Sequence, residues 1–351
     1  MYCFSLLGLF SISQQAQMEH HRHPTPQEQE FPQLLVLHPP AVFTAFHHLF
    51  TAKFQVLKAY ESPLPTDLFL TTYAESVRAV LCAGSSPITA NVLSHLPSLQ
   101  VVVSASAGVN HIDFPECRRR GISVANAGTV FSEDVADVAV VLLIDVLRKI
   151  TGGDRFVRRR DWPCHGNYPL GSKLEGKRVG IVGLGSIGIE VAKRLESFGC
   201  IISYNSKTKK PNVTYPFHPN VSQLASNSDV LIICCSLTDQ TRHMINREVM
   251  SALGKGGVII NVGRGAIINE KELVECLVEC LVEGEIGGAG LDVFENEPNV
   301  PKELFGLDNV VLLPHRAAFT EESFFDCSQL VIANLEAFFG NRPLLTPVTD
   351  C

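Results

Sequence analysis

The chain has 351 residues, 46% of them hydrophobic and 19% charged, and a formal net charge of −7 at pH 7. This length fits about two domains at the usual ~100–200 residues each. The negative charge argues against nucleic acid or an anionic membrane surface as a partner, because both attract clustered basic side chains. Any functional basic patch must therefore be local.

The first 30 residues differ from the rest in composition. Residues 3–12 are apolar, but the run is too short to cross a bilayer and no basic residue precedes it. Residues 14–30 are rich in Gln, His and Pro, which is typical of disorder. We expect a disordered extension on a cytoplasmic protein without a membrane partner. A plastid transit peptide is the alternative, although Glu19 and Glu28 disfavour it.

Short apolar runs alternate with helical stretches along the remaining chain, which predicts two α/β domains with parallel sheets. The first set of predicted strands covers residues 33–37, 55–59, 79–82, 101–104 and 123–125. The second set covers residues 178–183, 201–204, 230–235, 258–262, 288–293 and 310–313.

A long apolar helix is expected between the two sets, over residues 135–150, with Ser132 as its N-cap. Such a helix suits a spine between domains or a dimer face, and an ordinary buried helix fits the sequence equally well. Further on, Leu-Val-Glu-Cys at 273–276 recurs at 277–280 and nearly again at 281–284. Four residues add about one helical turn, so we interpret the repeat as an insertion tolerated in a surface helix.

A glycine-rich turn follows the strand predicted at 178–183. Gly183, Gly185 and Gly188 have the spacing that admits a tight turn, a close approach of the backbone to a pyrophosphate, and close packing of the next helix. The strand before the turn and the helical spacing after it favour a dinucleotide site. The whole turn is expected to contact the cofactor: Gly183, Leu184, Gly185, Ser186, Ile187 and Gly188.

The end of the next strand indicates which dinucleotide binds. An acidic residue there would accept hydrogen bonds from the adenosine ribose, but the chain has Ser206 and Lys207, with Lys209 and Lys210 close behind. A hydroxyl and positive charge suit a 2′-phosphate, so the sequence predicts NADPH/NADP+. We expect Ser206, Lys207 and Lys210 to contact it.

Three clusters lie at the ends of later strands, where ligands of open α/β sheets bind. Arg264 stands between two glycines, Asp292 and Glu297 follow another strand, and His315 follows the last. His315 is the candidate proton donor to a keto oxygen, and Glu297 would favour its protonated ring. Arg264 can bind a carboxylate with its forked donors, while Asp292 is expected to contact the nicotinamide amide. The set predicts reduction of a 2-oxo acid.

These motifs together resemble those of the D-isomer-specific 2-hydroxyacid dehydrogenases, and most of all plant-type NADPH-dependent glyoxylate/hydroxypyruvate reductases. The resemblance covers residues 33–348 and rests on residues 183–188, 261–265, 288–298 and 314–315. It implies two Rossmann-like doubly wound domains with the active site in the cleft between them. The substrate-binding domain would comprise residues 31–127 and 318–351, and the dinucleotide-binding domain residues 128–317.

The resemblance also assigns roles to residues. Arg264, Glu297 and His315 would form the catalytic triad, and the protein would be a homodimer acting on a small-molecule 2-oxo acid. Substrate contacts are expected from Gly84, Ser85, Ala107, Gly108, Arg264 and, from the partner of a dimer, Trp162. Cofactor contacts beyond those above are expected from Cys235, Ser236, Thr241, Val262, Gly263, Arg264, Asp292 and His315.

Three departures from the family pattern affect these expectations. Arg316 to Phe319 replace a common Gly-Ser after the histidine, Lys207 stands where related enzymes have arginine, and Ser236 replaces a proline. Alternatives to hydroxypyruvate and glyoxylate reduction are an aromatic 2-oxo acid such as hydroxyphenylpyruvate, or a non-catalytic nucleotide-sensing co-regulator. The eleven cysteines lack zinc-ligand spacing, so we expect reduced thiols and no metal site.

Overall fold

The computed structural model describes residues 31–349, except Ser85 and residues 279–285. The expected disorder of residues 1–30, the end of the Leu-Val-Glu-Cys repeat and the substrate contact expected of Ser85 lie outside the described residues. Within them, no helix is long and apolar enough to cross a membrane.

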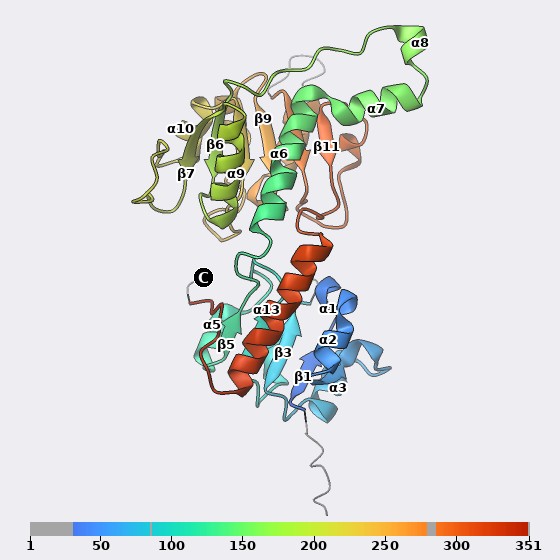
Figure 1. Ribbon diagram of the computed structural model, residues 1–351, viewed down its shortest axis with the longest axis vertical. Helices are drawn as coiled ribbons and strands as arrows, with labels where there is room; N and C mark the ends of the chain where they lie inside the picture. The colour runs from blue at the N-terminus through green and yellow to red at the C-terminus, as the bar shows by residue number, and fades with distance from the viewer. Residues whose placement is uncertain (1–30, 85, 279–285, 350–351) are drawn as a thin grey trace, which may run out of the picture. The chain divides into compact units, whose positions relative to one another are not determined.

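Two parallel sheets organise residues 32–349 (Figure 1). The first has the order β2-β1-β3-β4-β5, and the second has the order β11-β10-β9-β8-β6-β7. The strands of the first sheet are β1 (Gln33–Val36), β2 (Gln55–Lys58), β3 (Ala79–Cys82), β4 (Val101–Ser104) and β5 (Ser123–Ala125). Those of the second are β6 (Arg178–Val182), β7 (Ile201–Asn205), β8 (Val230–Ile233), β9 (Val258–Asn261), β10 (Gly288–Leu291) and β11 (Val310–Leu312). The eleven predicted strands and the predicted fold class are confirmed.

Continuous apolar runs explain why these segments form central strands. Every residue of β3, β4, β8 and β9 is buried, as expected for parallel strands whose two faces are both covered by helices. In each sheet the strand order reverses once, between β1 and β3 and between β6 and β8. Such reversal points open a crevice at the carboxyl ends of the strands, which is where ligands of α/β sheets bind.

Helices connect the strands. In the first half these are α1 (Ala41–Ala45), α2 (His47–Thr51), α3 (Thr66–Tyr73), α4 (Ala90–Ser94), α5 (Phe114–Arg119), α6 (Ser132–Arg148), α7 (Ile150–Arg158) and α8 (Trp162–His165). In the second half they are α9 (Ser186–Ser197), α10 (Val221–Ser226), α11 (Arg247–Leu253), α12 (Glu270–Val278) and α13 (Glu321–Phe339).

The long helix α6 departs from its predicted ends. Phe131 is its N-cap and makes no side-chain capping bond, while Ser132 is the first helical residue and is buried. The predicted N-cap was therefore wrong. The helix also ends at Arg148 rather than at residue 150, because Lys149 adopts φ 57° and ψ 42°, a left-handed conformation that ends the helix.

α6 packs on α9 and on the strand β10 (Figure 1). Small residues in β10 allow this close approach: a Cβ at Gly290 would lie 3.0 Å from the Cβ of Leu142, and one at Gly288 would lie 2.9 Å from Cγ1 of Val146. One face of α6 is thus buried against the second sheet, while Val141 on its other face is 60% exposed. The spine and dimer-face alternatives stay predictions.

After β11 the chain returns to the first sheet. α13 packs on β4 and α1. Thr320 caps it by accepting a hydrogen bond from Ser323 N at 3.2 Å, and its hydroxyl donates to Asp134 Oδ2 in the first turn of α6 at 2.7 Å. The exact domain boundaries, 31–127 with 318–351 and 128–317, stay a prediction.

The described part of the repeated segment is not purely a surface helix. In α12, Leu273, Cys276 and Leu277 are buried. Their spacing of three and one residues places them on a single face of a helix. The interpretation of the repeat as an insertion tolerated in a surface helix extends over residues outside the described part and stays a prediction.

Leu142→Ala should destabilise the protein by about 2–5 kcal/mol, because the 1% exposed leucine fills the contact between α6 and β10. Leu68→Ala, at a position of α3 with 50% exposure, is the matched control and should change stability by less than about 0.5 kcal/mol. Denaturant unfolding with equal m-values measures both. Equal costs for the two variants would contradict the packing described.

Candidate active site

The glycine-rich turn between β6 and α9 has one distinct reason for each glycine. Gly183 has φ 95°, and a Cβ there would lie 2.6 Å from the backbone of Cys235. A Cβ at Gly188 would collide with the carbonyl of Gly183, so this glycine lets the helix pack on the strand. A Cβ at Gly185 would meet nothing within 4 Å. The open space lies just where a pyrophosphate would approach the backbone.

The N-terminus of α9 is available to an anion. Its N-cap is Gly185, which provides no side-chain acceptor for the amides of the first turn. Leu184 is buried and anchors the turn from beneath, while Ser186 and Ile187 begin the helix. Free amides at a helix N-terminus bind phosphate groups. The residues present therefore fit a dinucleotide.

The end of β7 carries unpaired positive charge. Asn205 ends the strand and its Nδ2 donates to His218 O at 2.8 Å, so no carboxylate stands at this position. The Ser206 hydroxyl donates to Thr208 O at 2.7 Å, and the amide of Lys210 donates to the Tyr204 hydroxyl at 2.9 Å. Lys207 is exposed, and none of the lysines at 207, 209 and 210 pairs with an acidic side chain in the described part of the chain.

The ends of β8 and β9 form the other side of the glycine turn. Cys235 faces Gly183, and a Cβ at Gly263 would lie 3.0 Å from the carbonyl of Cys235. The Thr241 hydroxyl donates to Ser236 O at 2.8 Å and accepts from Thr238 N at 2.8 Å, which folds that loop on itself. Val262 is buried beneath it. The cofactor contacts expected of these residues stay a prediction.

His315 and Glu297 are directly joined. His315 Nδ1 lies 2.7 Å from Glu297 Oε2, and Phe294 N donates to Glu297 Oε1 at 3.0 Å. Burial opposes ionisation of Glu297, but its bonds to His315 and Phe294 and the charges of His315 and Arg264 lower its pKa overall. The pair leaves Nε2 of His315 as the ring nitrogen able to donate a proton.

Arg264 points toward the first domain. Its Nε donates to Asn110 Oδ1 at 3.3 Å, its Nη1 donates to Gly263 O at 2.7 Å, and Gly108 lies against its guanidinium. Burial lowers its pKa, and the charge of Glu297 partly restores it. A guanidinium in this setting is a strong ligand for a carboxylate, because little water competes for it.

Asp292 holds the segment that carries His315. Its carboxylate accepts from Arg316 N at 2.7 Å and from Ala317 N at 3.0 Å, and its carbonyl accepts from His315 N at 2.8 Å. These bonds stabilise His315 in its left-handed conformation, φ 51°. Burial raises the pKa of Asp292. The expected contact of Asp292 with a nicotinamide stays a prediction. In the structure this carboxylate fixes the backbone that follows His315.

The loops predicted to bind substrate are joined to each other. Ile88 N donates to His111 O at 2.9 Å and Asp113 N donates to Ile88 O at 2.8 Å. This ties the segment after β3, which contains Gly84, to the segment after β4, which contains Ala107 and Gly108. A Cβ at Gly84 would meet nothing within 4 Å, so its backbone is open to a ligand.

The sequence did not predict that asparagine and histidine side chains would take part in the hydrogen bonds around the Arg264 turn and the Ala107 loop. Asn126 Nδ2 donates to Ala107 O at 2.7 Å, and Asn261 accepts from Gly263 N at 3.0 Å while donating to Arg264 O at 3.0 Å. His111 Nε2 lies 3.2 Å from Ser104 Oγ, and burial together with the charge of Arg264 lowers its pKa to about 4. The Asn-X-Gly spacing was the available signal, since an asparagine side chain readily bonds an amide two residues on: Asn126 accepts from Gly128 N at 3.0 Å, as Asn261 does from Gly263 N.

Two further expectations concern exposed residues. The guanidinium of Arg316 lies 4.3 Å from the ring centroid of Phe319, so the departure after His315 forms a cation–π pair. Trp162, at the start of α8, is 60% exposed.

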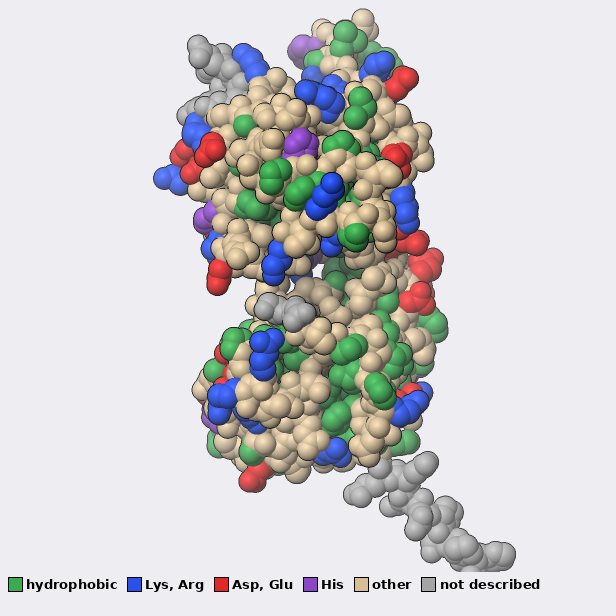
Figure 2. Space-filling view, turned by 90° about the vertical axis from the view of Figure 1, so that its left-hand side faces the viewer, with side chains coloured by type: hydrophobic (Ala, Val, Ile, Leu, Met, Phe, Trp, Pro, Cys, Tyr) green, Lys and Arg blue, Asp and Glu red, His purple; other side chains and the backbone are tan. Residues whose placement is uncertain are grey.

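No group of three or more metal-ligating side chains occurs among the described residues. On the face shown in Figure 2, Lys and Arg are dispersed among other side chains rather than gathered in a stripe.

Comparison with known proteins agrees with this arrangement. A family model for the NAD-binding domain of D-isomer-specific 2-hydroxyacid dehydrogenases matches residues 140–317. A glyoxylate/hydroxypyruvate reductase of Arabidopsis thaliana is 55% identical over 92% of this chain and 98% of its own length. A hydroxyphenylpyruvate reductase of Plectranthus scutellarioides is 49% identical over 84% of this chain and 93% of its own.

A solved structure gives the same result. The NADPH-dependent glyoxylate/hydroxypyruvate reductase of Sinorhizobium meliloti, crystallised with NADP and malonate, superposes with a TM-score of 0.83 at 35% identity, covering 91% of this chain and 97% of that one. The chain therefore belongs to the family of D-isomer-specific 2-hydroxyacid dehydrogenases.

Proposed function

We propose that this protein is an NADPH-dependent reductase of small 2-oxo acids, converting hydroxypyruvate to glycerate and glyoxylate to glycolate. The observation that carries the proposal is the His315–Glu297 pair at 2.7 Å, with Arg264 close enough for its charge to lower the pKa of Glu297. A proton donor and a carboxylate ligand are the two groups that such a reduction requires. The named activities of the relatives support the same substrates.

The cofactor is expected to lie along the carboxyl ends of the second sheet. The open backbone at Gly185 and the uncapped first turn of α9 would hold the pyrophosphate. Lys207 and Lys210, which pair with no acidic side chain among the described residues, and the hydroxyl of Ser206 would hold the 2′-phosphate. Asn205 stands where a carboxylate would repel it. The bound dihydronicotinamide supplies a hydride to the keto carbon.

The side chains perform the rest of the reaction. Arg264 and the backbone at Gly84 and Gly108 bind the substrate carboxylate, and the Arg264 guanidinium also polarises the keto oxygen. As negative charge develops on that oxygen, His315 Nε2 donates its proton. Glu297 stabilises the protonated ring before the transfer and keeps it oriented throughout.

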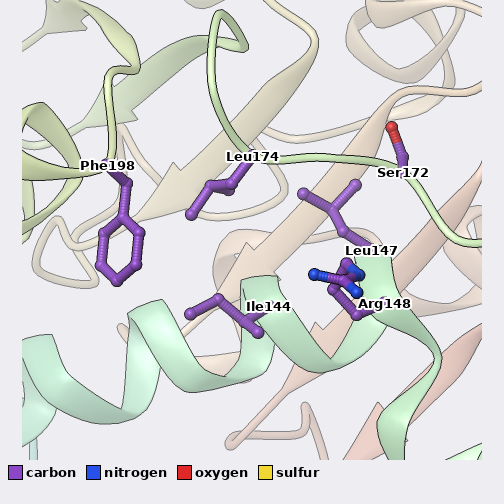
Figure 3. Close-up of a pocket in the computed structure, with 6 residues that line it drawn as sticks. All are labelled: Ile144, Leu147, Arg148, Ser172, Leu174 and Phe198. Carbon is purple, nitrogen blue, oxygen red and sulfur yellow. The ribbon is translucent and has the colours of Figure 1, made fainter.

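A homodimer is part of the proposal. Apolar side chains on α6 to α8 are exposed, namely Val141, Ile150, Val157 and Trp162. Next to them, α6 and residues 172–198 enclose a mostly apolar hollow of about 120 Å³, lined by Ile144, Leu147, Arg148, Ser172, Leu174 and Phe198 (Figure 3). Exposed apolar surface of this kind marks an interface, and Trp162 would reach the partner's active site. The cytoplasmic location stays a prediction.

Hydroxyphenylpyruvate is the second candidate substrate. The 49% identity to a hydroxyphenylpyruvate reductase favours it. A nucleotide-sensing role is disfavoured, since a sensor needs the cofactor turn but not the paired His315 and Glu297.

Steady-state kinetics of the purified protein decide between these activities. We expect kcat/KM to be higher for hydroxypyruvate and glyoxylate than for hydroxyphenylpyruvate, and higher with NADPH than with NADH. Lys207→Asp should lower the NADPH preference by about tenfold or more, equal to about 1.4 kcal/mol. Lys255→Asp, which reverses the charge of an exposed lysine before the start of β9, is the matched control. Turnover of the aromatic acid alone would replace the leading substrate assignment.

Substitutions in the glycine turn separate its two functions. Gly185→Ala should leave the melting temperature nearly unchanged, because its Cβ has open space, but should weaken NADPH binding by about tenfold or more. Gly183→Ala should instead destabilise the fold by roughly 1–3 kcal/mol, because φ 95° is strained for alanine and the Cβ meets Cys235. Fluorescence titration with NADPH and thermal unfolding measure both. Undiminished binding by Gly185→Ala would place the pyrophosphate elsewhere.

His315→Asn tests the proton donor. It should reduce kcat by about 10²–10⁴-fold while NADPH binding stays within about twofold, because the ring acts on the keto oxygen rather than on the dinucleotide. His95→Asn, at the exposed end of α4, is the matched control. A wild-type kcat in His315→Asn would exclude His315 as the donor.

A further inference from the structure

A buried carboxylate lies behind the loop that carries Glu297. Glu270, the first residue of α12, is 9% exposed, and its Oε1 accepts a hydrogen bond from Glu295 N at 3.1 Å. The preceding amide, Phe294 N, donates to Glu297 Oε1 at 3.0 Å. Two successive amides of one short loop are therefore held by two different carboxylates, one of which belongs to the catalytic pair.

The third carboxylate of this region has a partner of its own. Glu295 Oε1 lies 2.7 Å from His243 Nε2, and His243 N donates to Ala266 O at 2.8 Å in the turn after Arg264. His243 and Glu295 thus join the Arg264 turn to the Glu297 loop. Glu270, by contrast, pairs with no Lys, Arg or His side chain of the described residues; its printed bond is to a backbone amide.

The charges act on one another. Burial raises the pKa of Glu270 and the charges of Glu295 and Glu297 raise it further, while the bond from Glu295 N opposes the rise. The charged groups that interact with Glu297 are His315, Arg264, Glu270 and Asp292, and those that interact with His315 are Glu297 and Asp292. Because Glu270 and Glu297 accept from successive amides, a negative charge on Glu270 lies near Glu297 and disfavours its ionised form unless a cation balances it. The His315 ring, 2.7 Å from Glu297, would be that cation when it is protonated.

We infer that Glu270 is a positioning residue of the active site: its carboxylate holds the Glu295 amide, and its charge, acting through Glu297, favours the protonated His315 on which reduction depends. The inference rests on the proposed function and deepens it. Glu270 touches neither substrate nor cofactor in this scheme, so it acts on the pH range of the reaction rather than on the binding of either reactant.

Two substitutions separate charge from hydrogen bonding. Glu270→Gln keeps an oxygen that can accept from Glu295 N but removes the charge. Glu270→Asp keeps the charge but shortens the reach to that amide. Glu272→Gln is the matched control, because it removes a charge from the same helix where the carboxylate accepts from Arg247 N at 2.6 Å instead.

The pH profile of kcat/KM for reduction is the main readout. In Glu270→Gln the alkaline fall of kcat/KM should move to lower pH by about half a unit, so that kcat/KM well above the fall drops by about threefold. Glu270→Asp should keep the position of the fall even if its kcat is lower at every pH. Glu272→Gln should change neither. KM for NADPH should be unaffected in all three variants.

An unshifted profile in Glu270→Gln overturns the inference, and so does a shift in Glu270→Asp that equals the shift in the Gln variant. The Asp variant also decides the question if the Gln variant does not fold. An NMR titration of the His315 ring, assigned by the loss of its signal in His315→Asn, tests the same coupling without turnover. If the wild type reduces no 2-oxo acid, the proposed function fails, while the titration of wild type and Glu270→Gln still decides the inference.

Discussion

The parallel arrangement of the second sheet is the constraint on which the site depends. Parallel strands all end at one edge, so residues that directly follow different strands meet there whatever their distance along the chain. The segments after β6, β7, β9, β10 and β11 supply, in that order, the glycine turn, the lysines, Arg264, Glu297 and His315. Glu297 and His315, 18 positions apart, thereby meet at 2.7 Å, and Gly183 meets the backbone of Cys235 after β8.

The charged side chains at this edge of the sheet change one another's protonation equilibria. Arg264 and His315 both favour the ionised form of Glu297. The carboxylate of Asp292 accepts hydrogen bonds from the two backbone amides that follow His315. His111 remains neutral beside Arg264 because burial and the guanidinium both disfavour a second positive charge. Arg264 is thereby left as the cation that a substrate carboxylate would meet.

Much of the fold could be predicted from the sequence, because buried parallel strands are continuous apolar runs and the glycine turn has a steric reason at each position. Helix ends were less predictable. Lys149 ends α6 in a left-handed conformation that lysine seldom adopts, and Ser132 lies inside the helix although its residue type favours the cap.

The partners of the catalytic residues were harder still to foresee. Asn110 reaches Arg264 from 154 residues away, and Asn126 bonds the Ala107 carbonyl from another strand end. Single polar residues of this kind have no periodicity, and an Asn-X-Gly pattern such as that at Asn126 predicts only the local bond to Gly128 N, so only the folded chain shows which distant groups they meet. The functional roles of the predicted site residues rest on geometry and family membership, and the variants described above are their test.

Lys207 and Lys209 after β7 are exposed, and neither pairs with an acidic side chain among the described residues. This exposure affects how the protein would respond to its surroundings. Attraction between solvent-exposed charges is screened over about 8 Å at physiological ionic strength and over about 3 Å at 1 M. If such lysines determine the preference for NADPH over NADH, the ratio of the two affinities would decrease as the salt concentration rises. A preference that depended on a buried arginine with two hydrogen bonds to the phosphate would change less. Cofactor choice in this chain would then depend on the solvent as well as on the sequence.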